Sequence, residues 1–104
     1  MLNRIPKSFT VGGQDIEVKI VESIPCDKLG ECTLWNGDMS IAKNYKGYPQ
    51  TQSSQNNTFF HELTHLILDT MGEYELSQNE RFVSTFGGFL TEAVRSFKYN
   101  EDGE

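Results

Sequence analysis

Hydrophobic and polar positions alternate near the start of the chain in the manner of a β-strand. In residues 16–20, three branched apolar residues alternate with Glu17 and Lys19, which is the period of a strand with one buried face. Residues 9–11 form a second short run, and Gly12-Gly13 follows it. Because glycine adopts the positive φ that a tight turn requires, this segment predicts a β-hairpin.

A second hairpin is expected a few residues further along the chain. Residues 32–35 and 39–42 are separated by Asn36-Gly37-Asp38, and Asn-Gly between two such runs is a strong short-range signal for a hairpin. Residues 44–50 contain a glycine and a proline, and we expect them to form a loop.

The second half of the chain changes to a helical period. Residues 53–71 lack proline and glycine and predict a long helix that stops at Gly72. After a short connection, residues 78–98 predict a second helix with Gly87-Gly88 in its middle, which is tolerated where another backbone approaches closely. Its expected apolar stripe consists of Phe82, Phe86, Phe89, Leu90, Ala93 and Phe97. The fold class is therefore α+β: a small antiparallel sheet of two N-terminal hairpins followed by two packed helices.

The length of the chain limits the number of domains, and its charge limits the kinds of partner that it can bind. A chain of 104 residues supports one core, so residues 1–99 are assigned to a single domain and residues 100–104 to a frayed polar tail. The net charge is −6 and the nine basic residues are scattered, so we expect no nucleic acid or membrane partner. No segment matches a signal peptide or a membrane span, which predicts a cytoplasmic protein whose Cys26 and Cys32 are reduced thiols.

One motif indicates chemistry: His61-Glu62-Leu63-Thr64-His65, inside the first predicted helix. Residues four positions apart share a helical face, so the two imidazoles can bind one metal ion at about 2.0–2.1 Å. Glu62 is rotated by about 100° from His61, and there it can accept a proton from a water molecule that the metal activates. A chance match is the alternative, but the chain contains two histidines and both lie in the motif, which favours a zinc site.

A catalytic zinc normally has three protein ligands and one open position. Because both histidines of the chain lie in the motif, the third ligand must be another type of residue. Glu80 is the preferred candidate, because a tight helix-turn-helix places the start of the second helix beside the first. A competing role for Glu80 is in a helix cap, since Ser77-Gln78-Asn79-Glu80 matches a capping box. Glu73, Glu75 and the two cysteines remain alternatives for the third ligand.

The sequence resembles the gluzincin branch of the zincin metallopeptidases. The resemblance rests on residues 61–68, which begin with the His-Glu-Leu-Thr-His motif, and on Asn79-Glu80-Arg81-Phe82-Val83. The second segment is similar to the glutamate helix of small ImmA/IrrE-like peptidases of phages and mobile elements. The resemblance implies a minimal zincin-like fold, with His61, His65 and Glu80 as zinc ligands and Glu62 as the general base. It also implies a substrate bound as an added strand along a sheet edge, for which residues 39–42 are the expected strand.

These observations predict a peptidase with Zn²⁺ as its cofactor and a peptide or an unfolded protein segment as its substrate. The alternative from a different class is a catalytically silent zinc-containing module for binding or regulation. A purely structural zinc is a third hypothesis, which the presence of Glu62 disfavours. The many phenylalanines are compatible with a homodimer. Candidates for stabilising an oxyanion or for lining the substrate groove are Tyr45, Tyr48, Tyr74 and Trp35.

Overall fold

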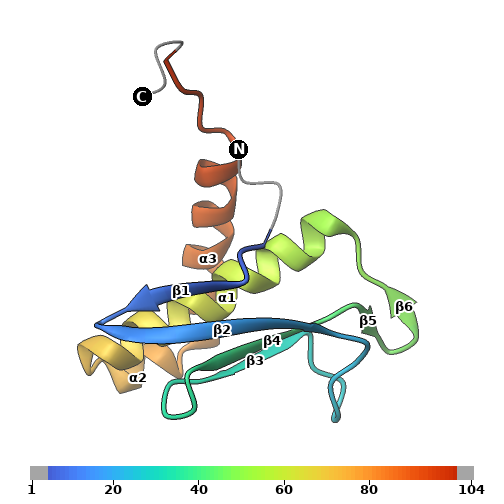
Figure 1. Ribbon diagram of the computed structural model, residues 1–104, viewed down its shortest axis with the longest axis horizontal. Helices are drawn as coiled ribbons and strands as arrows, with labels where there is room; N and C mark the ends of the chain where they lie inside the picture. Colours follow the sequence, from blue (N-terminus) through green and yellow to red (C-terminus); the bar gives the residue numbers. More distant parts are fainter. Residues whose placement is uncertain (1–4, 101–104) are drawn as a thin grey trace.

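A computed structural model of the protein describes residues 5–100 (Figure 1). In chain order, the elements are β1 (Ser8–Val11), β2 (Gln14–Val21), β3 (Gly30–Thr33), β4 (Asp38–Ala42), β5 (Asn44–Tyr45), β6 (Tyr48–Pro49), α1 (Gln52–Met71), α2 (Tyr74–Ser77) and α3 (Glu80–Arg95). Strands therefore precede helices, and the predicted α+β fold class is confirmed. The tail assigned to residues 100–104 lies outside the described residues except for its first position.

The four longer strands form one mixed sheet in the order β1-β2-β4-β3. Both predicted hairpins are present as antiparallel pairs. However, β2 and β4 run parallel, with Val18 opposite Met39 and Ile20 opposite Ile41, so the prediction of a purely antiparallel sheet is wrong. The reason is burial: β4 contributes two side chains that are fully buried, Met39 and Ile41, and it takes the central place beside β2.

The strand order also corrects the expected edge of the sheet. Residues 39–42 belong to β4, which lies between β2 and β3 and has no free edge. The edge strand on this side is β3 instead. The expected loop at residues 44–50 contains a small second sheet, in which β5 and β6 pair around Gly47 at a φ of 85°.

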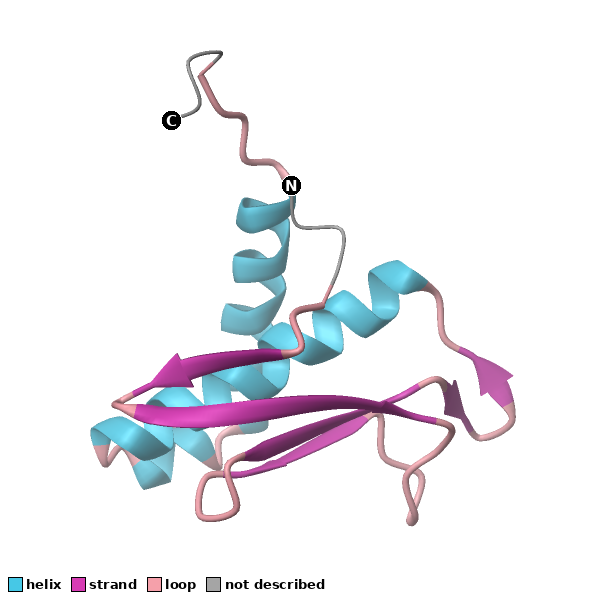
Figure 2. Ribbon diagram, in the orientation of Figure 1, coloured by secondary structure: helices cyan, strands magenta, loops and turns pink. Residues whose placement is uncertain are grey.

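Helix α1 covers one face of the sheet (Figure 2). The opposite face carries exposed polar side chains of β2. In β2, Ile16 is buried, whereas the side chains of Glu17 and Lys19 are exposed. This is the alternation expected of a sheet with one solvated face. The core between the sheet and α1 consists of Ile16, Met39, Ile41, Phe59, Phe60 and Leu66.

The boundaries of α1 have local causes. The Thr51 side chain accepts a hydrogen bond of 3.0 Å from the Ser54 backbone N–H, which satisfies a free donor at the helix start. At the other end Gly72 has a φ of 84°, a left-handed conformation that glycine adopts without strain, so the predicted stop is confirmed. Over residues 5–100, no helix has both the length and the apolar character that crossing a membrane requires.

The side of α3 that packs on α1 differs from the predicted apolar stripe. The buried residues of α3 are Val83, Gly87 and Thr91. Of the predicted stripe, Leu90 packs against the core, whereas Phe86 and Phe89 are 46% and 67% exposed. The helix packs through its small residues because they let it approach α1 closely, and its C-terminal half extends away from the sheet (Figure 1).

Candidate metal centre

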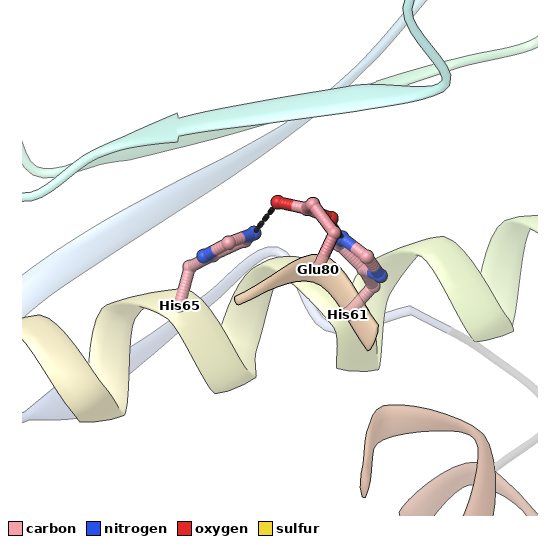
Figure 3. Close-up of side chains that lie close together, drawn as sticks. All are labelled: His61, His65 and Glu80. Carbon is pink, nitrogen blue, oxygen red and sulfur yellow. Dashed lines mark ion pairs between the residues drawn. The ribbon is translucent and has the colours of Figure 1, made fainter. Parts of the chain in front are cut away.

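The structure brings His61, His65 and Glu80 together (Figure 3). Both histidines project from α1, and Glu80 is the first residue of α3. One carboxylate oxygen of Glu80 lies 3.1 Å from His61 Nε2, and the other lies 3.3 Å from His65 Nε2. The three candidate ligand atoms are all within 4.8 Å of one another, although Glu80 lies fifteen positions after His65 in the chain.

These contacts fit a divalent metal ion of the size of zinc. Two ligand atoms bound tetrahedrally at about 2.0–2.1 Å from one metal are separated by about 3.3 Å. A carboxylate oxygen next to an imidazole nitrogen that bears no proton is repelled by it, so each contact requires a proton or a cation. A single cation among the three groups would satisfy all of them, and two imidazoles with one carboxylate form a known catalytic zinc set.

The position of Glu80 depends on the close approach of α3 to α1 at Gly87. A Cβ atom added at Gly87 would lie 3.2 Å from the Cα and 3.3 Å from the backbone nitrogen of His61. Thr91 supports this contact, because its hydroxyl donates to the Gly87 carbonyl oxygen at 2.7 Å and also lies 3.3 Å from Asn57 Oδ1. The absence of a side chain at one position thus sets the spacing that brings Glu80 to the histidines.

The capping-box interpretation of Glu80 is wrong, because α3 starts two residues later than that box requires. Asn79 is the N-cap, and its side-chain oxygen accepts a hydrogen bond of 3.1 Å from the Phe82 N–H. Glu80 is therefore free to contact the histidines. Within residues 5–100, the other proposed third ligands do not join a three-residue metal cluster with the histidines; they are Glu73, Glu75, Cys26 and Cys32.

Ser77 contacts His65 on the side of the ring away from Glu80. Its hydroxyl oxygen lies 3.1 Å from His65 Nδ1, and the serine is only 6% exposed. If Nδ1 donates this hydrogen bond, the lone pair of Nε2 points toward Glu80, which is the arrangement a metal-binding histidine needs. Sequence reasoning missed this role, because the same serine matched a helix cap.

Glu62 is buried between the motif helix and the edge strand β3. It is 7% exposed, and burial raises the pKa of its carboxyl group, while the Cys32 thiol and the two histidines oppose this with smaller effects. Cys32 Sγ lies 3.6 Å from the Glu62 backbone oxygen. Burial and the neighbouring carboxylate raise the pKa of the Cys32 thiol far above its usual range, so this thiol is neutral at physiological pH.

The three candidate ligands and Glu62 open into a cavity of about 510 Å³. Residues of β3 form its opposite wall, and Gly30 allows this strand to cross α1 closely, since a Cβ atom there would lie 2.6 Å from Thr58 Cγ2. Asn57 and Lys28 supply hydrogen-bond donors to the lining. No aromatic candidate lines it: the structure places Tyr45, Tyr48, Tyr74 and Trp35 elsewhere, and Trp35 is 90% exposed.

Comparison of the chain with protein-family models, curated proteins and solved structures finds no significant match. The functional argument therefore rests on the residues of this site.

Proposed function

We propose that the protein is a zinc-dependent peptidase of the gluzincin type. The observation that supports this most strongly is the convergence of His61, His65 and Glu80 beside a buried carboxylate, that of Glu62, in an open cavity. A structural zinc site would need a fourth protein ligand and has no use for this carboxylate. A catalytic site needs three ligands, an open position and a general base, and the chain offers side chains for each of these parts.

Glu62 would act as the proton carrier. His61, His65 and Glu80 would hold the zinc ion, which would supply Lewis acidity and activate water for attack near neutral pH. The Glu62 carboxylate takes one proton from the attacking water and then delivers it to the nitrogen of the leaving amine. Burial raises the pKa of this carboxyl group above its ordinary value, which favours holding the proton between the two steps.

The proposed substrate is an extended peptide or an unfolded protein segment lying along β3. This strand is an edge of the sheet, pairs only with β4 among the described strands and borders the cavity. A substrate strand that adds to such an edge satisfies its free backbone groups and passes above the site.

The unpaired thiols of Cys26 and Cys32 support a reducing compartment such as the cytoplasm.

The test uses zinc-loaded protein and a library of quenched fluorescent peptides. Glu62→Gln should abolish cleavage while zinc content and folding are retained, because the substitution removes the base and leaves the ligands. Glu17→Gln is the matched control, since Glu17 is an exposed residue of β2 that does not line the cavity, and its activity should equal that of the wild type. If Glu62→Gln cleaves as fast as the wild type, the proposed role of Glu62 is wrong. If zinc binds but no peptide is cut, the silent binding module becomes the better account.

A further inference from the structure

An aromatic face on α3 takes no part in the proposed site. Phe82, Phe86, Phe89, Ala93 and Phe97 recur every three or four positions; they follow one side of the helix and continue past its end, and we call them the aromatic face. The rings of Phe82 and Phe86 stack at 5.7 Å, and Phe86, Phe89 and Phe97 are 46%, 67% and 55% exposed. This face lies about 100° around the helix from the side that packs on α1. It is a contiguous apolar surface, which marks an interaction site more often than chance exposure does.

We propose that the aromatic face is the interface of a homodimer, in which α3 packs antiparallel against α3 of a second copy. The helix extends away from the sheet, so a second helix can reach this side of its C-terminal half (Figure 1). Aromatic side chains present about 150–250 Å² each and roughly half of that is exposed here, so the rings of two such faces bury on the order of 700 Å², to which flanking side chains add. That area is at the lower end for specific interfaces, and the dimer is therefore expected to dissociate on dilution.

Charges beside the aromatic face favour a second copy as the occupant. Arg81 and Glu92 lie eleven positions, or about three turns, apart on the same flank of the face. Neither forms an ion pair within residues 5–100. In an antiparallel pair related by a twofold axis, Arg81 of each copy faces Glu92 of the other, which gives two reciprocal ion pairs. A parallel pair would place this flank of the two copies on opposite sides of the contact, where neither ion pair can form, so the charge pattern favours the antiparallel orientation.

This dimer leaves the candidate metal centre open. Glu80 and Phe82 are two positions apart and thus about 200° apart around the helix, so the two surfaces face different directions. The inference does not depend on the peptidase function, and either can fail alone.

The experiment is sedimentation velocity over a wide range of protein concentration, with circular dichroism to verify that each variant is folded. We expect a monomer–dimer equilibrium for the wild type and a monomer for the double variant Phe86→Ser/Phe89→Ser. Arg81→Glu should raise the dissociation constant about tenfold by placing two glutamates opposite each other. Arg81→Glu combined with Glu92→Arg should restore it, because the reciprocal pairs are rebuilt with their signs exchanged.

The control is Trp35→Ser, which removes an even more exposed aromatic side chain outside the face and should leave the equilibrium unchanged. A monomeric wild type at every concentration would overturn the proposal. So would an assembly that survives the double phenylalanine variant, or a charge-exchanged variant that dimerises no better than Arg81→Glu.

Discussion

The two sides of α3 differ in a way that the sequence alone does not reveal. The side that faces α1 presents Val83, Gly87 and Thr91, which are small or of medium size and buried. The other side presents large phenylalanines, of which Phe86 and Phe89 remain largely exposed. In most amphipathic helices the largest apolar side chains face the core. Here Val83, Gly87 and Thr91 are buried, Leu90 and Val94 are partly buried beside them, and Phe86, Phe89 and Phe97 stay exposed.

The close approach of α3 to α1 at Gly87 leaves little room for a large side chain at this contact. A helix packed through phenylalanines would lie farther from α1, since interaxial distance depends on the side chains at the contact. Glu80 would then move away from His61 and His65. Packing through Gly87 brings the carboxylate to 3.1 Å and 3.3 Å from the histidine nitrogens and leaves the phenylalanines available for another surface.

The largest effect is expected from shortening a side chain on the buried side. Val83 is fully buried, so Val83→Ala should lower the free energy of unfolding by about 2–3 kcal/mol through lost burial and a cavity. Phe89→Ala removes more atoms but should change it by less than about 0.5 kcal/mol in dilute protein. Urea unfolding at low micromolar concentration measures both. If both variants lost the same free energy of unfolding, the two sides of α3 would contribute equally to stability, contrary to this account.

The two adjacent glycines give a sharper test of the same contact. Gly87→Ala should lower the free energy of unfolding by about 1–2 kcal/mol, since the new Cβ would press on the backbone of His61. At Gly88 a Cβ atom meets nothing within 4 Å, so Gly88→Ala should raise stability by about 0.5–1 kcal/mol through helix propensity. Thermal unfolding of the apoprotein distinguishes them. If both variants were more stable than the wild type, the packing of α3 on α1 would not require the close approach at Gly87.

The comparison extends to α2, where one residue faces α1 and another faces solvent. Ser77 is buried against His65, whereas Tyr74 is 61% exposed. Ser77→Ala should weaken zinc binding about tenfold, because His65 loses the hydrogen bond that orients its ring. Tyr74→Ala should leave zinc affinity unchanged, and Ser77→Thr should restore most of it. Competition with a chromogenic chelator measures these affinities, and wild-type affinity in Ser77→Ala would exclude this positioning role.

The smallest perturbation changes no residue and compares the two thiols. Cys26 is exposed, while the raised pKa of the partly buried Cys32 keeps its thiol protonated. Iodoacetamide at pH 8 should therefore modify Cys26 first, and both cysteines should react alike after unfolding, as mass spectrometry can show. Because the pKa of Cys32 is higher in the folded than in the unfolded protein, its contribution to stability is complete below about pH 8.5 and is lost at higher pH. Rapid modification of Cys32 in the native protein would contradict its burial.

Local signals in the sequence were sufficient to predict both hairpins, the end of α1 and part of the candidate metal site. Gly12-Gly13 and Asn36-Gly37 identified both hairpins, and Gly72 identified the end of α1. Helical periodicity predicted that His61 and His65 share one face of a helix. Glu80 was chosen because a tight connection between the two helices would bring it near that face. The structure brings these three side chains together, while their binding of zinc stays a prediction.

The features that sequence reasoning missed depend on tertiary packing. The two hairpins join through β2 and β4 rather than through β2 and β3, which depends on which strand buries more apolar surface, and a hairpin signal contains no such information. The side of α3 that faces α1 was missed because periodicity located the large apolar residues rather than the small ones. Ser77 and Cys32 come close to the site only through the fold, at 3.1 Å from His65 and 3.6 Å from Glu62 respectively.

The central claim is that His61, His65 and Glu80 hold one zinc ion, and metal content tests it most directly. Elemental analysis of protein loaded with zinc at neutral pH and then desalted should give about one zinc per chain for the wild type and for Glu62→Gln. His65→Ala and Glu80→Ala should lose it. A wild-type protein without zinc, or a Glu80→Ala variant that retains zinc with wild-type affinity, would contradict the account.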